Sequence, residues 1–253
     1  MKKTILMSLV ALMAMTMTSC LSMNFGNGGV DKTPTQVTQI NQVTTMQAFD
    51  VVDNAGAFKV IYEQGPEYSV RVEASEQALK EMTVYVKDHE LHISKSVAKP
   101  TVEFKNVKLY VTSPDLKHID LAGSGLFTAS QPIHVNHELN VDIAGSGKVL
   151  LVAVKCVYSG LEIAGSGNIE VGNMEVTDVK ADIAGSGNII LGTVACNTLN
   201  IDIAGSGDVK CENITAYDVT TDIAGSGNVY LKGTINQHAE DIAGSGKVHI
   251  NEE

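Results

Sequence analysis

The sequence contains no tryptophan, and aromatic residues of all kinds make up only 5% of its 253 residues. A sugar-binding cleft would favour exposed aromatic side chains, on which sugar rings stack. The aromatic residues expected to face outward in the repeats described below do not share a position in the repeat: Phe127, Tyr158, Tyr217 and Tyr230. This scarcity argues against a sugar cleft, although a glycan could still be bound by a face of hydrogen-bonding groups.

Basic residues are also scarce. Lysine and arginine number 18 against 29 aspartates and glutamates, which gives a formal net charge of −11. A surface of this charge repels the phosphate groups of nucleic acids and of anionic lipids. Nucleic acid is therefore not expected as a partner. Any contact with a membrane is expected to come from an attached lipid and not from a basic face.

The apolar run near the N-terminus is short. Residues 5–15 are apolar apart from Ser8 and follow Lys2 and Lys3. Such a run is too short for a membrane span and is typical of a secretion signal. The following Ser19-Cys20 resembles a lipobox, where cleavage precedes a cysteine that then carries lipid. We predict a lipoprotein signal peptide over 1–19 and a lipid anchor on Cys20; the alternative is secretion without lipid.

This signal predicts a protein of the cell envelope, attached to the outer membrane through its N-terminal lipid. Whether it faces the periplasm or the cell surface stays open. Residues 20–45 are rich in asparagine, glycine, glutamine and threonine. Such a segment buries little apolar surface, so it predicts a flexible tether.

Residues 46–117 have the composition of a strand-rich region. Runs of Val, Tyr, Phe and Ile with a period of two predict strands at 48–52, 58–63, 68–74, 84–87, 90–94 and 107–112. A tight connection is expected at 87–90. One helix is expected over 75–82, with Ser75 capping its first turn. No set of residues in this part indicates a chemical site.

The second half of the chain is dominated by a repeat. The tetrapeptide Ala-Gly-Ser-Gly begins at Ala122, Ala144, Ala164, Ala184, Ala204, Ala224 and Ala243. The spacings are 22, 20, 20, 20, 20 and 19 residues, and an acidic residue stands two places before each alanine. A motif that recurs at a fixed period indicates a structural unit, not an active site.

Apolar residues alternate within each unit. Isoleucine precedes the alanine in every unit from 141 onward, and Val or Ile recurs six residues later. Gly-Ser-Gly in each unit would interrupt a helix, so these are short strands with one buried face. Single units bury too little surface to be stable alone and must stack, with like residues about 4.8 Å apart. The repeat over 118–253 therefore predicts an all-β fold, a parallel β-helix, and the strand-rich part is expected to continue into it or cap it.

Gly-Ser-Gly is expected to form the corner of each rung, where both glycines can adopt a positive φ and neighbouring corners approach closely. The predicted corner residues, with the acidic position of each unit, are Asp142, Gly145, Ser146, Gly147, Asp182, Gly185, Ser186, Gly187, Asp202, Gly205, Ser206, Gly207, Asp222, Gly225, Ser226 and Gly227.

The acidic positions present a problem, because stacked carboxylates repel by about 1 kcal/mol per neighbouring pair even in water. The favoured interpretation is that each carboxylate accepts hydrogen bonds from the N–H groups or serine hydroxyl of its corner. The alternative is a calcium ladder with further oxygens from the column Asn168, Asn188, Asp208 and Asn228. The first interpretation predicts no metal and no cofactor.

An enzyme is not indicated, since catalysis needs a few unique groups that converge, whereas these acidic positions are repeated. The close pairs His134/His137 and His89/His92 lack an evident third metal ligand. Cys156 and Cys196 fall two rungs apart, about 9–10 Å, which is too far for a disulfide. Cys211 falls on an apolar position, and a bond between Cys196 and Cys211 stays open.

The lipobox-like start, the strand-rich region and the Gly-Ser-Gly corners followed by Asn-Ile or Asn-Val together resemble one family. It is the Bacteroidota family described as "putative auto-transporter adhesin, head GIN domain", and the resemblance covers residues 49–250. It implies a right-handed β-helix without catalytic residues and a role in cell adhesion.

The predicted function is a non-catalytic envelope lipoprotein that presents a β-helical face to a glycan or a protein. A purely structural envelope protein is the alternative, and a polysaccharide-active β-helix enzyme is a further one. The sequence gives no indication of the oligomeric state.

Overall fold

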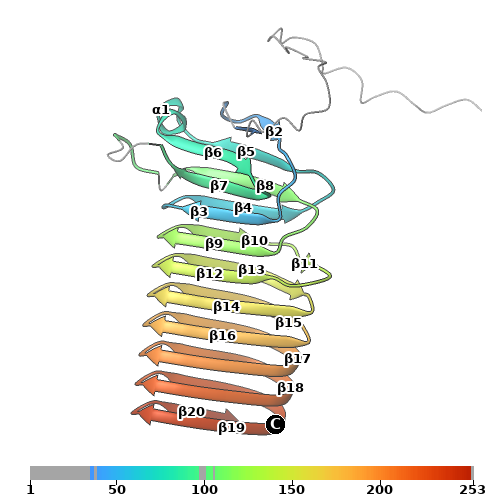
Figure 1. Cartoon of the computed structure of the whole chain (residues 1–253), viewed down its shortest axis with the longest axis vertical. Helices are drawn as coiled ribbons and strands as arrows, with labels where there is room; N and C mark the ends of the chain where they lie inside the picture. The colour runs from blue at the N-terminus through green and yellow to red at the C-terminus, as the bar shows by residue number, and fades with distance from the viewer. Residues whose placement is uncertain (1–34, 37–38, 97–100, 105, 252–253) are drawn as a thin grey trace, which may run out of the picture. The chain divides into compact units, whose positions relative to one another are not determined.

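The structure is a computed structural model that describes residues 35–36, 39–96, 101–104 and 106–251. The predicted signal peptide and Cys20 lie outside the described residues. The fold is a β-solenoid of about seven turns, in which strands stack as successive rungs (Figure 1). The all-β prediction is confirmed. No helix in the described part of the chain has the length and apolar character needed to cross a membrane.

The N-terminal part contains most of the strands that the sequence predicts. Its elements are β1 (Thr35–Gln36), β2 (Val43–Thr45), β3 (Val51–Ala55), β4 (Lys59–Gln64), β5 (Ser69–Glu73), α1 (Glu76–Lys80), β6 (Met82–Lys87), β7 (Glu90–Lys95) and β8 (Lys108–Ser113). The strand expected at 48–52 instead begins at Val51, because the parallel pairing of this segment with β7 and β9 begins there.

The tether predicted over 20–45 is wrong for its last residues. Strand β2 pairs antiparallel with β5, and Ile40 forms a parallel bridge with Val72. The physical reason is that β5 offers an edge, and Val43 with its two threonines has the β-branched character that suits a strand. Residues 39–45 therefore belong to the folded unit.

The predicted helix and tight connection are both present. Ser75 caps α1, its side chain accepting a hydrogen bond of 3.1 Å from the N–H of Ala78. Strands β6 and β7 form an antiparallel hairpin. Its connection places Asp88 and His89 at φ 52° and 66°, the left-handed values that a two-residue hairpin turn requires.

The repeats form the rungs, as predicted. Their strands are β9 (His118–Gly123), β10 (Leu126–Ala129), β11 (Ile133–His134), β12 (Asn140–Gly145), β13 (Lys148–Lys155), β14 (Tyr158–Gly165), β15 (Asn168–Glu175), β16 (Asp178–Gly185), β17 (Asn188–Gly205), β18 (Asp208–Gly225), β19 (Asn228–Gly244) and β20 (Lys247–Asn251). Neighbouring rungs pair in parallel with like residues in register, for example Asp182 with Asp202 and Ile183 with Ile203.

The stack begins before the first Ala-Gly-Ser-Gly corner. Strand β3 pairs in parallel with β9, and β4 pairs in parallel with β10. On the other side β3 pairs with β7 and β4 pairs with β8, also in parallel. Antiparallel pairs and α1 then close this end of the stack (Figure 1). The N-terminal part therefore continues the solenoid and caps it.

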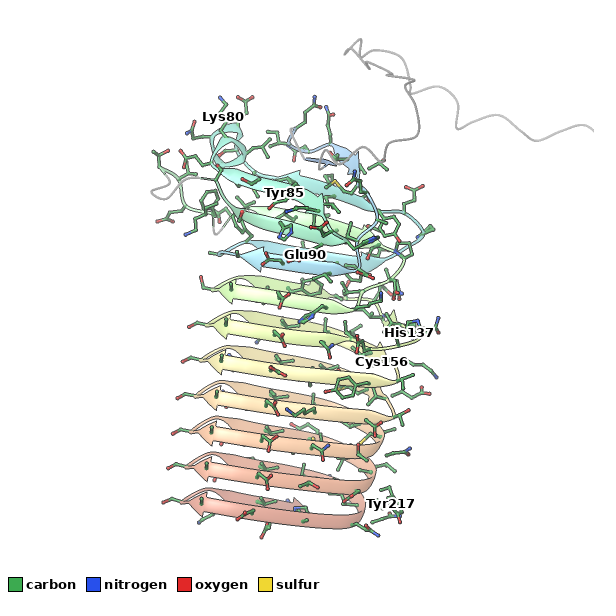
Figure 2. All side chains as sticks on the ribbon, viewed as in Figure 1. Lys80, Tyr85, Glu90, His137, Cys156 and Tyr217 are labelled. Carbon is green, nitrogen blue, oxygen red and sulfur yellow. The ribbon has the colours of Figure 1, made fainter. Side chains whose placement is uncertain are left out.

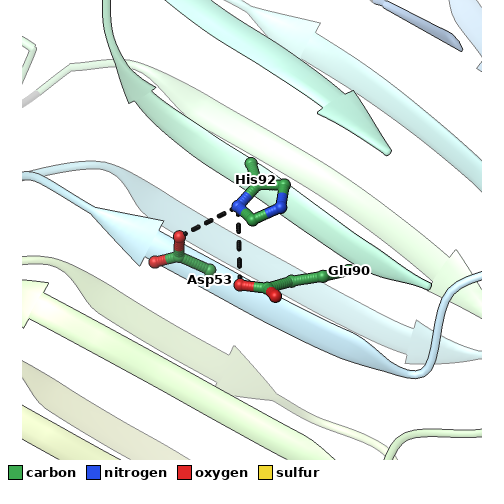
Figure 3. A group of neighbouring side chains, drawn as sticks. All are labelled: Asp53, Glu90 and His92. Carbon is green, nitrogen blue, oxygen red and sulfur yellow. Dashed lines mark hydrogen bonds and ion pairs between the residues drawn. The ribbon is translucent and has the colours of Figure 1, made fainter. Parts of the chain in front are cut away.

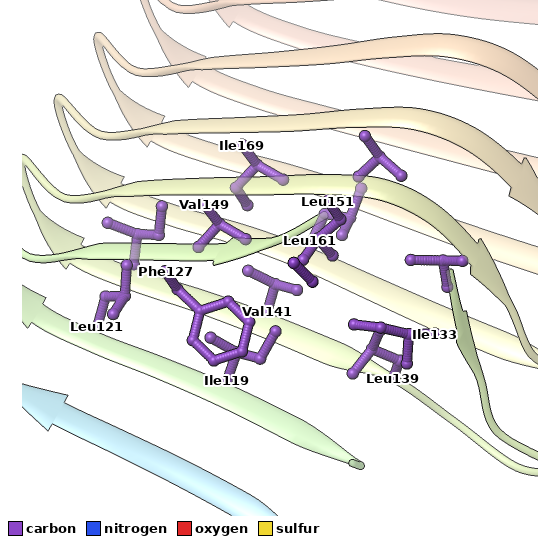
Figure 4. Close-up of a cluster of buried hydrophobic side chains, with 14 of the residues drawn as sticks. Ile119, Leu121, Phe127, Ile133, Leu139, Val141, Val149, Leu151, Leu161 and Ile169 are labelled. Atoms are coloured by element: carbon purple, nitrogen blue, oxygen red, sulfur yellow. The ribbon is translucent and has the colours of Figure 1, made fainter. Parts of the chain in front are cut away.

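The core lies between the faces of each rung. The predicted inward isoleucines are at most 2% exposed: Ile143, Ile163, Ile183, Ile203 and Ile223. Figure 4 shows the part of this core where the first repeats meet. Phe127, expected to point outward, is 0% exposed and stacks on Tyr62 with ring centroids 5.8 Å apart. The reason is its register with the inward Val60 and Val149.

The three cysteines in the repeats are free thiols. Cys196 pairs in register with Ala216, and Cys211 pairs with Leu191, so the two thiols occupy different columns. Burial raises the pKa of Cys211 to about 12, and Cys156 and Cys196 are shifted to about 11 mainly for the same reason. The disulfide left open between Cys196 and Cys211 is not formed.

Candidate functional site

The most regular polar feature of the molecule is a column of outward carboxylates, one from each rung, which we call the acidic ladder. The register of the parallel strands aligns Asp53, Asp120, Asp142, Glu162, Asp182, Asp202, Asp222 and Asp241. Each carboxylate stands beside inward residues of its strand, so the pleat turns it toward solvent. The ladder runs along one face from β3 to β19.

Two histidines accompany the first carboxylates of the ladder. His92 on β7 places Nδ1 3.2 Å from Asp53 Oδ2 and 3.4 Å from Glu90 Oε1 (Figure 3). His118 on β9 places Nε2 3.3 Å from Asp120 Oδ1 and 2.9 Å from Asp142 Oδ2. Hydrogen bonds to Asp120 and Asp142 raise the pKa of His118 to about 10, against the opposing effect of burial.

A lysine neutralises the middle of the ladder. The ammonium group of Lys180 is hydrogen-bonded to the carboxylate of Asp182 on the same strand. This bond is the main cause of a pKa of Lys180 above its usual range. One rung further along, Asn200 stands at the register position of Lys180, so the cation is not repeated.

The last part of the ladder has no such neutralisation. Among the described residues, Asp202, Asp222 and Asp241 have no salt-bridge partner. The pKa of Asp202 is raised, first by burial of the carboxyl group and then by repulsion from Asp182 and Asp222. These carboxylates border a groove of about 500 Å³. Its other lining residues are Asp182, the alanines Ala184, Ala204, Ala224 and Ala243, and the isoleucines Ile183, Ile203 and Ile223, whose side chains point into the core.

The expectation that the ladder carboxylates cap their corners is wrong. The N–H of Ser206 donates to the carbonyl of Gly185 at 2.8 Å, and the N–H of Ser226 donates to that of Gly205 at 2.8 Å. The preceding rung thus supplies the acceptors that the carboxylates were expected to supply. No hydrogen bond joins a corner serine hydroxyl to a ladder carboxylate within the part of the chain that the structure describes.

The two glycines of each corner have different roles. The first has positive φ in every repeat, for example 138° at Gly205. The second does not, which corrects the expectation for both. At Gly207 a Cβ would lie 2.1 Å from the carbonyl oxygen of Gly187 and 2.7 Å from Cγ2 of Ile183. The second glycine is therefore required by the close approach of stacked backbones, not by its φ.

Side-chain oxygens of the column proposed for a calcium ladder already accept hydrogen bonds from the next rung. Asn188 donates from Nδ2 to Oδ1 of Asn168 at 3.2 Å, and the N–H of Asp208 donates to Oδ1 of Asn188 at 3.1 Å. Asn228 donates through both its N–H and Nδ2 to Oδ1 of Asp208, at 2.8 and 3.1 Å. These side chains link successive rungs beside the corners.

The first glycines of successive corners are register partners, so the corners stack along one edge of the solenoid (Figure 2). His134 and His137 are both exposed. The sequence interpretation missed Asp53, Glu90 and His118 as site residues, and it considered His92 only as a close pair with His89. A signal for the first was present, because Asp53-Asn54-Ala55-Gly56 repeats the Asp-Leu-Ala-Gly of 120–123 without the following Ser-Gly.

A parallel solenoid that repeats one polar side chain along a face is a repeat-type scaffold, a class that presents extended surfaces. The chain belongs to the family described as "Putative auto-transporter adhesin, head GIN domain", whose model matches residues 48–252. The predicted family is thereby confirmed. No curated protein sequence matches the chain.

Solved structures share the fold. A "putative adhesin" from Bacteroides fragilis NCTC 9343 is 22% identical, with a TM-score of 0.74 over 88% of this chain and 100% of that one. A "putative adhesin" from Parabacteroides distasonis ATCC 8503 is 22% identical, with a TM-score of 0.71 over 87% and 98%. A "putative lipid binding protein" from the same strain is 24% identical, with a TM-score of 0.65 over 88% and 98%.

Proposed function

We propose that this protein is a non-catalytic lipoprotein of the cell envelope that acts as an adhesion module, and that the last part of the acidic ladder, Asp202, Asp222 and Asp241, binds a basic region of a partner protein. The observation that carries the proposal is the run Asp202, Asp222 and Asp241, which has no salt-bridge partner among the described residues and borders a groove. Membership of the adhesin family supports the general role.

The physical reason is electrostatic complementarity. Carboxylates in register lie about 4.8 Å apart and repel one another, by about 1 kcal/mol per pair in water. Lysine or arginine side chains of a partner would relieve this repulsion. Each contact would therefore contribute more free energy of binding than an isolated ion pair does. Charge complementarity of this kind also speeds association and selects against acidic partners.

A protein partner is favoured over a glycan. The exposed tyrosines Tyr217 and Tyr230 lie on different strand segments and occupy different repeat positions, so they do not form a common stacking platform. Neutral sugars gain little from a row of carboxylates. A non-catalytic role is supported by the repetition of the acidic side chains along the face, where each rung supplies the same group.

The lipid anchor is proposed on the sequence alone, from Ser19-Cys20 after the apolar run at 5–15. A lipid on Cys20 would hold the solenoid at the outer membrane. The family description of an adhesin is consistent with a location in the cell envelope.

The test is a binding titration of the full chain with a lysine-rich peptide at physiological ionic strength. The variant Asp202→Asn/Asp222→Asn/Asp241→Asn should bind at least about ten-fold more weakly, because three charge-assisted contacts are lost. The matched control is Glu170→Gln/Glu175→Gln/Glu212→Gln, which removes the same charge from rung positions outside the ladder. The control should stay within about two-fold of the unchanged chain.

Equal weakening in both triple variants would mean that only net charge matters, and the proposed binding face would be wrong. A glycan array provides the second arm. Specific glycan binding that survives the ladder substitutions would favour the glycan alternative. Absence of binding in both arms would favour a purely structural envelope protein.

A further inference from the structure

The beginning of the acidic ladder differs from its end because two imidazole rings stand among the carboxylates. One group is Asp53, Glu90 and His92, contributed by β3 and β7 (Figure 3). We call it the His92 triad. The other is His118, Asp120 and Asp142, contributed by β9 and β12, which we call the His118 triad. In each triad the three ligand atoms lie within 4.8 Å of one another.

The spacing of the ligand atoms in both triads fits a metal site. In the His92 triad Nδ1 lies 3.2 and 3.4 Å from two carboxylate oxygens, and in the His118 triad Nε2 lies 3.3 and 2.9 Å from two others. Tetrahedral Zn²⁺ with bonds of about 2.0–2.1 Å holds neighbouring ligand atoms about 3.3 Å apart. A single N–H points well at one oxygen only, whereas a metal ion bonds both.

The rigid part of the fold positions these side chains. Asp53 pairs in register with His92 on one side and with Asp120 on the other, so the two triads are adjacent along the stack. The ring of Tyr85 stacks on that of His92, with centroids 4.9 Å apart and an interplanar angle of 26°. Stacking of this kind holds the imidazole in orientation, as the supporting residues of metal sites do.

The ligand set indicates which metal would bind. Imidazole nitrogen with carboxylate oxygen suits Zn²⁺ and its first-row neighbours, whereas Ca²⁺ and Mg²⁺ take oxygen ligands. The side chains of both triads are between 23% and 40% exposed, so further coordination positions would face solvent. Three protein ligands leave the fourth position of tetrahedral Zn²⁺ open to water.

We propose that the His92 triad and the His118 triad are two adjacent sites for a divalent transition metal, each with one imidazole and two carboxylates. The sites lie at the N-terminal end of the same face on which the proposed partner-binding run lies, but share no residue with it. The two metal sites can therefore be tested independently of the proposed partner binding. The sequence predicted no metal, because the third residue of each triad, Asp53 or Asp142, joins the other two only through the register of parallel strands.

The first experiment measures Zn²⁺ stoichiometry of the full chain by calorimetry, with Ca²⁺ in a parallel titration. The unchanged chain should bind two Zn²⁺ ions and should not exchange them for Ca²⁺. His92→Ala and His118→Ala should each bind one, and the double variant none. The matched control Asp222→Asn removes a ladder carboxylate that has no imidazole beside it, and it should still bind two.

The second experiment needs no variant. Diethyl pyrocarbonate modifies histidine, and mass spectrometry locates the modified rings. Zn²⁺ should protect His92 and His118, while the exposed His134 and His137 should react equally with and without metal. Lack of protection of both His92 and His118 would overturn the proposal even where a variant fails to fold.

Three other outcomes would also overturn it. An unchanged stoichiometry in the histidine variants would show that the imidazoles are not ligands. Equal loss in Asp222→Asn would show diffuse attraction of cations by the ladder. Binding that occurs only at millimolar Zn²⁺, or equally with Ca²⁺, would show that the triads are ion pairs and not specific metal sites.

Discussion

Asp182 and Asp202 are register partners on neighbouring strands, but only Asp182 has an ammonium group beside it. Lys180 supplies that group, and Asn200 replaces it one rung on. Burial and repulsion from Asp182 and Asp222 raise the pKa of Asp202. The acidic positions look alike in the sequence, but only some of the carboxylates have a cation beside them. The carboxylates in the last part of the ladder have no such cation among the described residues, and they adjoin the groove.

The first prediction concerns Asp202→Asn. The amide removes a charge that the folded state disfavours, so the variant should be more stable than the unchanged chain at neutral pH. The carboxyl group of Asp202 is partly shielded from water, but the residue as a whole is exposed, so the gain is discounted to a few tenths of a kcal/mol, at most about 1. Urea denaturation at neutral pH measures the difference.

The pH dependence follows from the direction of the pKa shift. A carboxyl whose pKa is raised by folding binds its proton more tightly in the folded chain, so this group favours folding at low pH and opposes it above its raised pKa. The advantage of Asp202→Asn should therefore shrink as the pH falls toward about 4. A variant that is clearly less stable at neutral pH would contradict the inference that the folded chain disfavours the charge on Asp202.

The second prediction tests the inward column. Ile203 is 2% exposed, and Ile203→Ala should cost about 2–5 kcal/mol because it leaves a cavity in the core. Lys210 points outward and pairs with Glu212 at the surface, at 2.7 Å. Lys210→Ala should therefore cost no more than about 0.5 kcal/mol. Similar losses for the two substitutions in denaturant titrations would contradict the assignment of the faces.

The third prediction tests the corner. Gly205 has φ 138°, and a Cβ there would lie 2.2 Å from the carbonyl oxygen of Gly185. Gly205→Ala should cost about 2 kcal/mol or more, since backbone strain adds to a contact with backbone that cannot move aside. Ser206→Ala is the matched control at the exposed tip of the same corner and should stay within about 0.5 kcal/mol. Thermal or urea unfolding distinguishes them, and a tolerated alanine at Gly205 would contradict the stacked-corner geometry.

The repeat made most of this fold predictable, because the period placed Ile183 and Ile203 in one buried column and the glycines at one corner. The ladder's contacts were not predictable in the same way. Lys180 meets Asp182 through the pleat of one strand, but His92 meets Asp53 through parallel pairing of strands 39 residues apart. Only the register of β3 with β7 brings them together, and the partial repeat at 53–56 does not indicate which strand lies beside it. The acceptor of the Ser206 N–H was missed for a related reason, because it is a backbone carbonyl one rung away and not a side chain.

The last prediction concerns attachment to the membrane. Cys20 is the predicted site of lipid attachment, and acyl chains contribute about 0.8 kcal/mol per buried methylene to membrane binding. Cys20→Ala should therefore move the protein from the membrane fraction to the soluble fraction after cell lysis, and it should abolish labelling by a radioactive fatty acid. The matched control is Cys156→Ala, which removes a buried thiol inside the solenoid. It should leave the fractionation and the labelling unchanged. Full retention of Cys20→Ala in the membrane fraction would place the anchor elsewhere in the chain.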